Sequence, residues 1–354
     1  MTSSLTSRPF GTLSTGEQVS AFTLVGEGGL SLQVITYGGI VTHLRAPDRK
    51  GSLDDVVLGF DHLAAYLAGH PYFGAITGRI AGRVTGARFT LEGRTYDLAR
   101  NNPPNHLHGG LVGFDKRIWA AHSVARSDGA PSLRLTYHSP DGEEGYPGSV
   151  DVAVTYTVTR DNAFIIESEA VADRATPFGL THHGYFNLAG ESTGSIADHE
   201  LQIHADEIVA MDENNTLLGQ RVAVAGQPND FNHPRRLGDA VPHLYLQHGD
   251  LYLIRRTEST GQPPGLIPVA RVAEPRTGRV LTVSTTERFL QFYTGVSLDG
   301  TLTGKSNRPY RSHAGFCLEC EGYADGANNA AFGDILLRPG QPTRHTTVYS
   351  FSTY

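Results

Sequence analysis

The sequence is poor in cysteine, and it lacks long apolar runs. Only 2 of its 354 residues are cysteine, which is too few to build a disulfide framework. No apolar stretch approaches the roughly 18 residues that a membrane-spanning helix needs. The first eleven residues are polar and contain no apolar signal-peptide core. These absences predict a cytoplasmic protein without a membrane partner.

Basic charge is also scarce. The net charge is -7 and charged residues make up 18% of the chain, so we expect no broad basic surface and no nucleic-acid partner. Hydrophobic residues make up 39%, enough for a sizeable core, and 41 glycines and 19 prolines indicate many turns. The composition is typical of a globular protein with many short elements.

The dominant local pattern is alternation of apolar and polar residues. It is clearest over residues 150–158, and it recurs over 30–34 and 133–137. Alternation with period two is typical of half-buried strands, and turn signals such as Asp141-Gly142 and Thr277-Gly278 separate these runs. Helical patterns are few; Asp61 could cap a short helix ending at Leu67.

The pattern therefore predicts an all-β fold, a large and mostly antiparallel β-sandwich. No repeat or convincing linker divides the chain. We expect a single domain over residues 1–354, with the Pro/Gly-rich stretch 261–267 as a loop.

Two histidine clusters could carry chemistry. In Asn105-His106-Leu107-His108-Gly109-Gly110, a strand would place both histidine rings on one face, although a solvated loop fits as well. In the run from Thr181 to Leu188, His182 and His183 are adjacent. Neighbours on a strand face opposite ways, so at most one of these two rings points into a given site.

Glu319 lies inside the apolar, strand-like run Phe316–Cys320. Buried glutamates are rare unless they are paired or functional, which favours a functional role. Cys317 and Cys320 supply only half of a zinc site, and their flanks look like a strand rather than a redox-motif helix start. We expect two reduced thiols.

The stretch from Gly78 to Val84 carries two arginines, Arg79 and Arg83, between glycines. An arginine here could fork onto sugar hydroxyls. A surface ion pair explains the pattern equally well, and the residues alone favour the ion pair.

Taken in order, these motifs resemble those of the aldose 1-epimerase (galactose mutarotase) family. Each motif is short, but their joint order and spacing are specific, and they cover nearly the whole chain. The matching segments are Tyr37–Ile40, Val57–Phe60, Gly78–Ala81, Asn105–Gly110, Glu144–Gly148, His183–Leu188, Gln291–Gly295, Gly315–Glu319, Leu337–Gly340 and His345–Tyr349.

The resemblance implies a galactose mutarotase-like supersandwich and assigns roles to individual residues. The general acid matches His183 and the general base matches Glu319. Substrate-binding positions match the following four residues: Arg83, His108, Asp250 and Gln291. The match at Asp250, in His248-Gly249-Asp250, is weaker because the aromatic residue after it arrives one position early.

Other departures concern the surroundings of these residues. Gly82 stands where the family usually has Asn, and His182 stands where Asn is frequent. Cys320-Glu321-Gly322 follow Glu319 where Thr-Gln-His is common. The loss of an amide at position 82 puts substrate preference in question more than chemistry.

The implied reaction is the interconversion of α and β anomers of a free aldose such as galactose or glucose, without a cofactor or a metal. A non-catalytic sugar-binding protein would not need both His183 and Glu319. A cupin-like metal enzyme using His106 and His108 would want a glutamate soon after them, and none follows. A hexose-6-phosphate epimerase would need a basic phosphate pocket that the sequence does not locate. The partner is a small aldose, and the oligomeric state, monomer or homodimer, stays open.

Overall fold

The computed structural model describes residues 2–244, 249–256 and 265–354. Most of the loop expected at 261–267, and His248 of the motif before Asp250, lie outside these residues. Within them the chain is built almost entirely of antiparallel strands, as the alternating pattern predicts.

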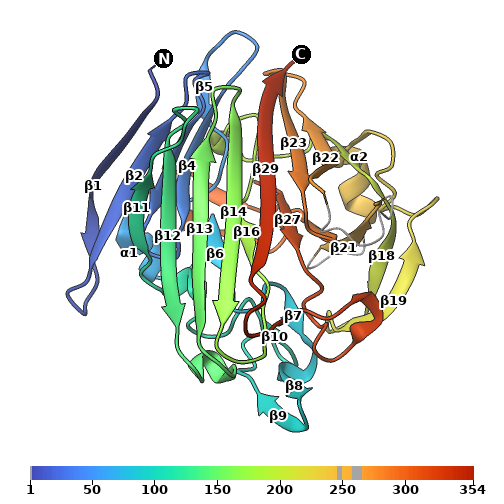
Figure 1. The fold of residues 1–354 in the computed structure, drawn as a ribbon. Helices are drawn as coiled ribbons and strands as arrows, with labels where there is room; N and C mark the ends of the chain where they lie inside the picture. The colour runs from blue at the N-terminus through green and yellow to red at the C-terminus, as the bar shows by residue number, and fades with distance from the viewer. Residues whose placement is uncertain (1, 245–248, 257–264) are drawn as a thin grey trace.

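The largest sheet has nine strands and crosses the front of Figure 1. Its order is β11-β12-β13-β14-β29-β23-β22-β17-β20. The bounds in that order are Ala120–Val124, Ser132–Ser139, Val150–Val158, Ala163–Ala172, Thr343–Thr353, Arg279–Thr285, Ile267–Ala273, Glu200–Ile203 and Arg235–Arg236.

Two five-stranded sheets accompany it. The first is β1-β2-β3-β4-β5, formed by Ser4–Thr12, Gln18–Val25, Ser31–Ile35, Val41–Pro47 and Leu53–Asp55. The second is β19-β18-β21-β24-β27, formed by Leu217–Ala223, Ala205–Met211, Asp250–Ile254, Phe289–Tyr293 and Cys317–Glu321.

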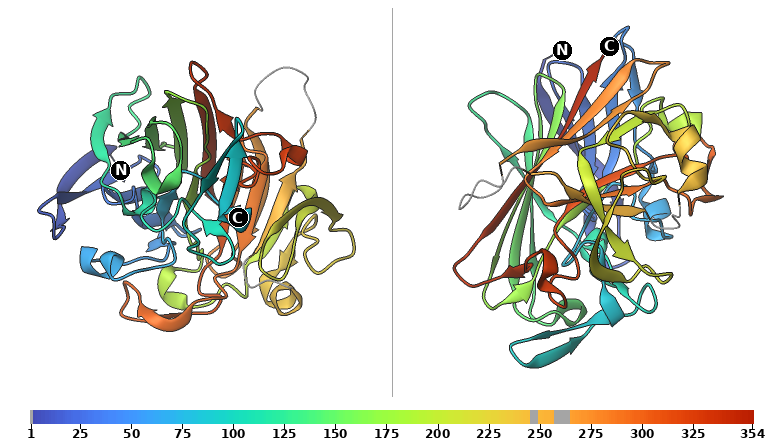
Figure 2. Two further views of the ribbon diagram at one scale, coloured as in Figure 1. Left: turned by 90° about the horizontal axis from the view of Figure 1, so that it is seen from below. Right: turned by 90° about the vertical axis from the view of Figure 1, so that its right-hand side faces the viewer.

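Short elements complete the fold. The hairpin β8–β9 projects at the bottom of Figure 1 and of the right-hand view in Figure 2. Among the described residues no helix is long and apolar enough to cross a membrane. The paired short strands are β7 (Arg83–Val84) with β10 (His106–Leu107), β6 (Ala75–Thr77) with β16 (Thr181–His183), β8 (Arg88–Leu91) with β9 (Arg94–Asp97), β15 (Thr176–Pro177) with β28 (Leu336–Leu337), and β25 (Asp299–Thr303) with β26 (Pro309–Arg311); the helices are α1 (Leu63–Leu67) and α2 (Leu237–Ala240).

Strand β29 holds the sandwich together. It lies in the middle of the nine-stranded sheet, between β14 and β23 (Figure 1), so it joins strands from both halves of the chain. Its Tyr349 is buried and donates a hydrogen bond of 2.9 Å to the carbonyl of Leu318 on β27. The nine-stranded sheet and the five-stranded sheet that contains β27 share one apolar core, which supports the proposal that residues 1–354 fold as a single domain.

The three strands expected from alternation are present as β3, β12 and β13. The role expected for Asp61 is wrong. Helix α1 has His62 at its N-cap position with no side-chain cap, and the Asp61 carboxylate bonds Nε2 of His43 at 3.1 Å instead. The Asp61 side chain therefore pairs with the imidazole of His43 on β4 instead of capping the helix.

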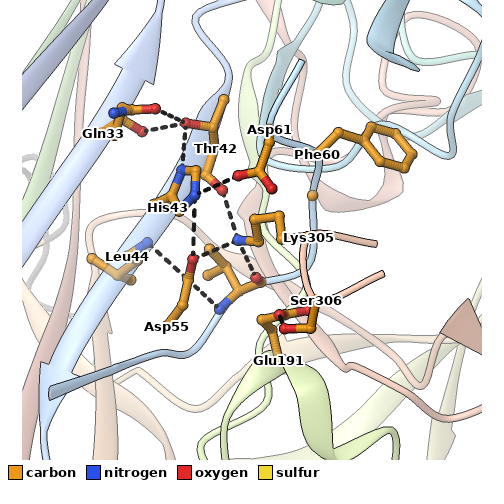
Figure 3. A network of polar contacts seen from close by, with 12 residues as sticks. Gln33, Thr42, His43, Leu44, Asp55, Phe60, Asp61, Glu191, Lys305 and Ser306 are labelled. Carbon is orange, nitrogen blue, oxygen red and sulfur yellow. Dashed lines mark hydrogen bonds and ion pairs between the residues drawn. The ribbon is translucent and has the colours of Figure 1, made fainter. Parts of the chain in front are cut away.

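Lys305 ties a distant loop to the first sheet (Figure 3). Its ammonium group donates to the carboxylate of Asp55 and to the carbonyls of Thr42 and Val57, each at 2.7 Å. The side chain is only 5% exposed. All three ammonium protons are satisfied, which is the condition under which a buried charge is tolerated.

Replacing Lys305 by methionine should destabilise the fold by about 3 kcal/mol, because a buried carboxylate and two carbonyls lose their donor. Urea unfolding at neutral pH would measure the change in the free energy of unfolding. Lys50→Met, at an exposed position, is the control and should change it by less than about 0.5 kcal/mol. Equal stabilities of the two variants would contradict this role.

Candidate active site

One cavity collects side chains from strands that are far apart in the sequence. His183 comes from β16, Glu319 from β27, Gln291 from β24 and Arg83 from β7, while His108 follows directly after β10. The remaining lining residues are Pro71, Tyr72, Gly82, Asn102, Leu107, Tyr185, Tyr293, Ser297 and Glu321. Five of the six residues assigned by the resemblance thus meet at one place.

The centre of the cavity is the contact between His183 and Glu319. Their Nε2 and Oε2 atoms lie 3.5 Å apart, and both residues are buried. The strands that carry them are joined by Thr181, which donates a hydrogen bond of 2.9 Å to the carbonyl of Cys320. Gln291 lies opposite Glu319 in the β24–β27 ladder. Oε2 of Glu319 has no hydrogen-bond partner among the described residues, so it can accept a proton from a ligand.

The ring of His183 is fixed from both sides. Tyr72 stacks on it at 5.6 Å between ring centroids, and Tyr185 stacks on it at 5.1 Å. The thiol sulfur of Cys317 lies 3.7 Å from Nδ1. Burial raises the pKa of this thiol, so it stays neutral. Its sulfur can accept a hydrogen bond from Nδ1–H, and this tautomer leaves Nε2 unprotonated and facing Glu319.

Burial governs the protonation of the pair. It raises the pKa of Glu319 well above its ordinary value, with the nearby Glu321 adding to the rise and Arg83 opposing it. It lowers the pKa of His183 to about 3. Both shifts favour neutral groups, so the empty cavity holds one exchangeable proton, shared between a carboxyl group and an imidazole.

Arg83 and His108 are held in place by two other residues that line the cavity. The guanidinium of Arg83 donates to the side-chain oxygen of Asn102 at 3.0 Å. Nδ1 of His108 accepts the backbone N–H of Gly82 at 3.1 Å, and burial lowers the pKa of this histidine well below its ordinary value. A neutral ring that accepts at Nδ1 carries its proton on Nε2, so His108 can donate a hydrogen bond to a ligand.

In each histidine cluster, one histidine lines the cavity and the other lies in the core. His182 is buried beside Phe164 and Tyr349, so only His183 of the adjacent pair lines the cavity, as expected. The expectation that His106 and His108 share a face is wrong. Strand β10 ends at Leu107 and His108 has a positive φ of 50°, so the chain turns between the two rings.

His106 is a core residue. Its Nδ1 contacts the carbonyl of Ala99 at 2.8 Å and its Nε2 contacts the hydroxyl of Tyr146 at 2.7 Å, so both nitrogens are occupied. Its fully buried ring does not line the cavity.

The two arginines of the Gly78–Val84 stretch have different roles. Arg79 is 2% exposed and donates to backbone carbonyls of Ser139, Pro147 and Gly148 at 2.8–3.2 Å. It is a buried structural residue, and the surface ion pair that the residues alone favoured is wrong for both arginines, because Arg83 lines the cavity. Arg79 lies between β6 and β7, whereas Arg83 is the first residue of β7.

Asp250 is the one assigned residue that does not line the cavity. It lies on β21 opposite Phe292, next to the Leu251–Gln291 pair, and its carboxylate accepts from the amide of Asn229 at 3.0 Å. Burial raises its pKa to about 6. Asp250 is therefore a neighbour of Gln291 whose role in substrate binding stays a prediction.

Sequence reasoning missed several lining residues. Tyr72 lies between glycines in Gly69–Gly74, and Tyr185 and Tyr293 belong to matched motifs. An aromatic residue in such a segment was the feature of the sequence that could have identified them as cavity residues. Glu321 follows Glu319 by two positions on one strand, and strand alternation places both on the same face.

Three side chains of the cavity lie close enough together to bind a metal ion. Ligand atoms of His108, His183 and Glu319 all lie within 4.8 Å of one another, a set that a zinc or iron ion could use. The positive charge of Arg83 near Glu319 opposes a cation there.

Cys317 and Cys320 are both free thiols.

Comparisons with known proteins agree with this geometry. The family model for aldose 1-epimerase matches residues 20–350. The galactose mutarotase of Sus scrofa is 41% identical over 350 residues, 99% of each chain, and the aldose 1-epimerase of Escherichia coli K12 is 32% identical over 342 residues, 95% of this chain and 96% of the relative. The crystal structure of an aldose epimerase homologue from C. elegans superposes with a TM-score of 0.84 at 27% identity, covering 99% of each chain. The family resemblance and the all-β fold are thereby confirmed: the chain belongs to the aldose 1-epimerase family.

Proposed function

We propose that this chain interconverts the α and β anomers of a free aldose, with Glu319 and His183 as its acid–base pair. The observation that carries the proposal is the 3.5 Å contact of these two side chains in a buried cavity. Family membership supports the reaction class, and the names of the relatives point to galactose as a substrate.

The reaction needs two proton transfers. A cyclic aldose is a hemiacetal, so opening the ring requires removal of the C1-hydroxyl proton and delivery of a proton to the ring oxygen. Glu319 takes the first proton and His183 gives the second. After rotation about the C1–C2 bond, the two residues reverse these roles and the ring closes on the other face. General acid–base catalysis of this kind contributes about 10²–10⁴-fold to a rate.

One shared proton is enough for this cycle. In the empty cavity the pKa shifts place it on Glu319. Sugar hydroxyls and Arg83 stabilise the carboxylate when the cavity fills, which moves the proton to His183 and prepares the pair for ring opening. Because ring closure returns the proton, the pair is ready for the next substrate.

The other assigned residues would hold the ring. Arg83 and Gln291 present donors to hydroxyl groups, and the Nε2 proton of His108 points to the oxygens near the reacting carbon. The resemblance also assigns a hydroxyl contact to Asp250, whose strand neighbours that of Gln291. Positioning the ring between acid and base turns a solvent reaction into an intramolecular one.

The charge of the cavity favours a neutral sugar over a sugar phosphate. Among the lining residues described, Arg83 is the one arginine or lysine, whereas Glu319 and Glu321 supply two carboxyl groups. A phosphate dianion would meet a single cation beside two acids. We also propose a cytoplasmic location, in keeping with two free buried thiols.

The acid–base pair predicts the effect of conservative substitutions. Glu319→Gln keeps the shape of the side chain but cannot accept the proton, so it should reduce kcat by about 10²-fold or more with nearly unchanged sugar affinity. His183→Asn should act likewise, and the double variant should lose less than the product of the two single losses. Polarimetry of freshly dissolved α-galactose and α-glucose measures the rate.

His106→Asn is the control for this series, because His106 is a buried histidine outside the cavity, and its effect on kcat should be far smaller. Near-full mutarotation by Glu319→Gln would contradict the proposal. Sugar binding without turnover by the unmodified chain would indicate a binding protein.

The pH dependence of kcat/KM follows from the shared proton. The active form carries one proton on the pair. A second proton is added only below the lowered pKa of His183, and the shared one is lost only above the raised pKa of Glu319. We therefore expect a plateau around neutrality whose acid limb lies well below the value of about 6.5 for an exposed histidine. An acid limb centred near that value, with circular dichroism unchanged, would contradict the assignment.

Activity should survive exhaustive chelation, because the proton transfers need no Lewis acid. Rates before and after dialysis against EDTA should agree within about twofold. Loss of activity that one specific divalent ion restores would show that His108, His183 and Glu319 act as metal ligands.

A further inference from the structure

Glu321 is a second buried carboxyl group of the cavity, and the acid–base cycle does not use it. It lies two residues after Glu319 on β27 and lines the same cavity. It is 3% exposed, and its Oε2 has no hydrogen-bond partner among the described residues. A buried polar atom without a partner is unfavourable, so this atom is placed to bind a group that enters the cavity.

Gly82 provides the space in front of Glu321. A Cβ atom at position 82 would lie 3.2 Å from Oε1 of Glu321 and 2.8 Å from Cβ of Ala324. The residue also has a φ of +81°, where a side chain is strained. Any larger residue at 82 would therefore crowd the carboxyl group, and the absence of a side chain leaves it open to the cavity.

The surroundings of Glu321 suit a hydroxyl group. Burial raises the pKa of this carboxyl, the charge of Glu287 adds to the rise, and Arg83 opposes it. A neutral carboxyl group offers one O–H donor and one carbonyl acceptor. A sugar hydroxyl also donates and accepts, so a two-bond contact satisfies both partners.

We infer that Glu321 is a specificity-determining residue, which binds one hydroxyl of the aldose other than the reacting C1 hydroxyl. The inference rests on the proposed function, because it assumes that Glu319 and His183 act on the reacting end of the ring. Gly82 and Glu321 act as one unit in this contact: the first supplies the opening and the second supplies the hydrogen-bonding group.

The test combines removal of single hydroxyls from the substrate with substitutions of Glu321. Polarimetry gives kcat/KM for galactose and for a series of monodeoxy galactoses, each lacking one hydroxyl, with the unmodified chain, Glu321→Ala and Glu321→Gln. With the unmodified chain, removal of the contacted hydroxyl should lower kcat/KM by roughly 10- to 100-fold. With Glu321→Ala that same removal should have little effect, while the other deoxy sugars behave as before.

Glu321→Gln also donates and accepts a hydrogen bond through its amide, so the same hydroxyl should remain the one whose removal lowers kcat/KM most. Glu191→Gln is the matched control: Glu191 is 5% exposed, accepts a hydrogen bond of 3.0 Å from Tyr310 and does not line this cavity. Its effect should be the same on all sugars. If Glu321→Ala does not fold, Glu321→Asp shortens the reach by one methylene and gives the same readout.

Two results would overturn the inference. One is a uniform loss on all sugars with Glu321→Ala, which indicates a structural or proton-transfer role. The other is an unchanged pattern, which indicates no contact. Failure of the proposed function looks different, since the unmodified chain would then mutarotate no sugar and Glu319→Gln would change nothing. Calorimetric binding of the same deoxy series would still test the Glu321 contact in that case.

Discussion

The site depends on the pairing of β24 with β27 beneath the nine-stranded sheet. This ladder sets Gln291 opposite Glu319, and the hydrogen bond from Thr181 to Cys320 attaches the strand that carries His183. Strand register is fixed wherever one face is buried, because a slip of one residue would turn every side chain over. The same constraint that buries Phe292 and Leu318 in the core therefore directs Gln291 and Glu319 into the cavity.

Burial sets the chemistry as well as the geometry. In water near neutrality a glutamate is ionised and a histidine is partly protonated. In this cavity desolvation pushes both toward neutral forms. The shared proton then rests on Glu319 until a bound sugar stabilises the carboxylate, and its transfer to His183 prepares ring opening.

Neighbouring residues of one type take opposite roles throughout the site. His183 serves the cavity while His182 packs in the core, and His108 serves it while His106 bonds Tyr146. The physical reason differs between the two pairs. Strand alternation separates the first, and a residue with positive φ turns the chain in the second.

The sequence by itself determined the strand pattern and the family, and it predicted His183 and Glu319 as the acid–base pair. Alternation over 150–158 requires no tertiary information, because period two is a local property of strands. Glu319 was identifiable because a carboxyl group in an apolar run has to be paired or functional. Only the tertiary structure buried Arg79 against backbone carbonyls, stacked Tyr72 on His183, and placed Gly82 against Glu321. Those relations join residues from different strands, and their distances follow from how the sheets pack rather than from spacing along the chain.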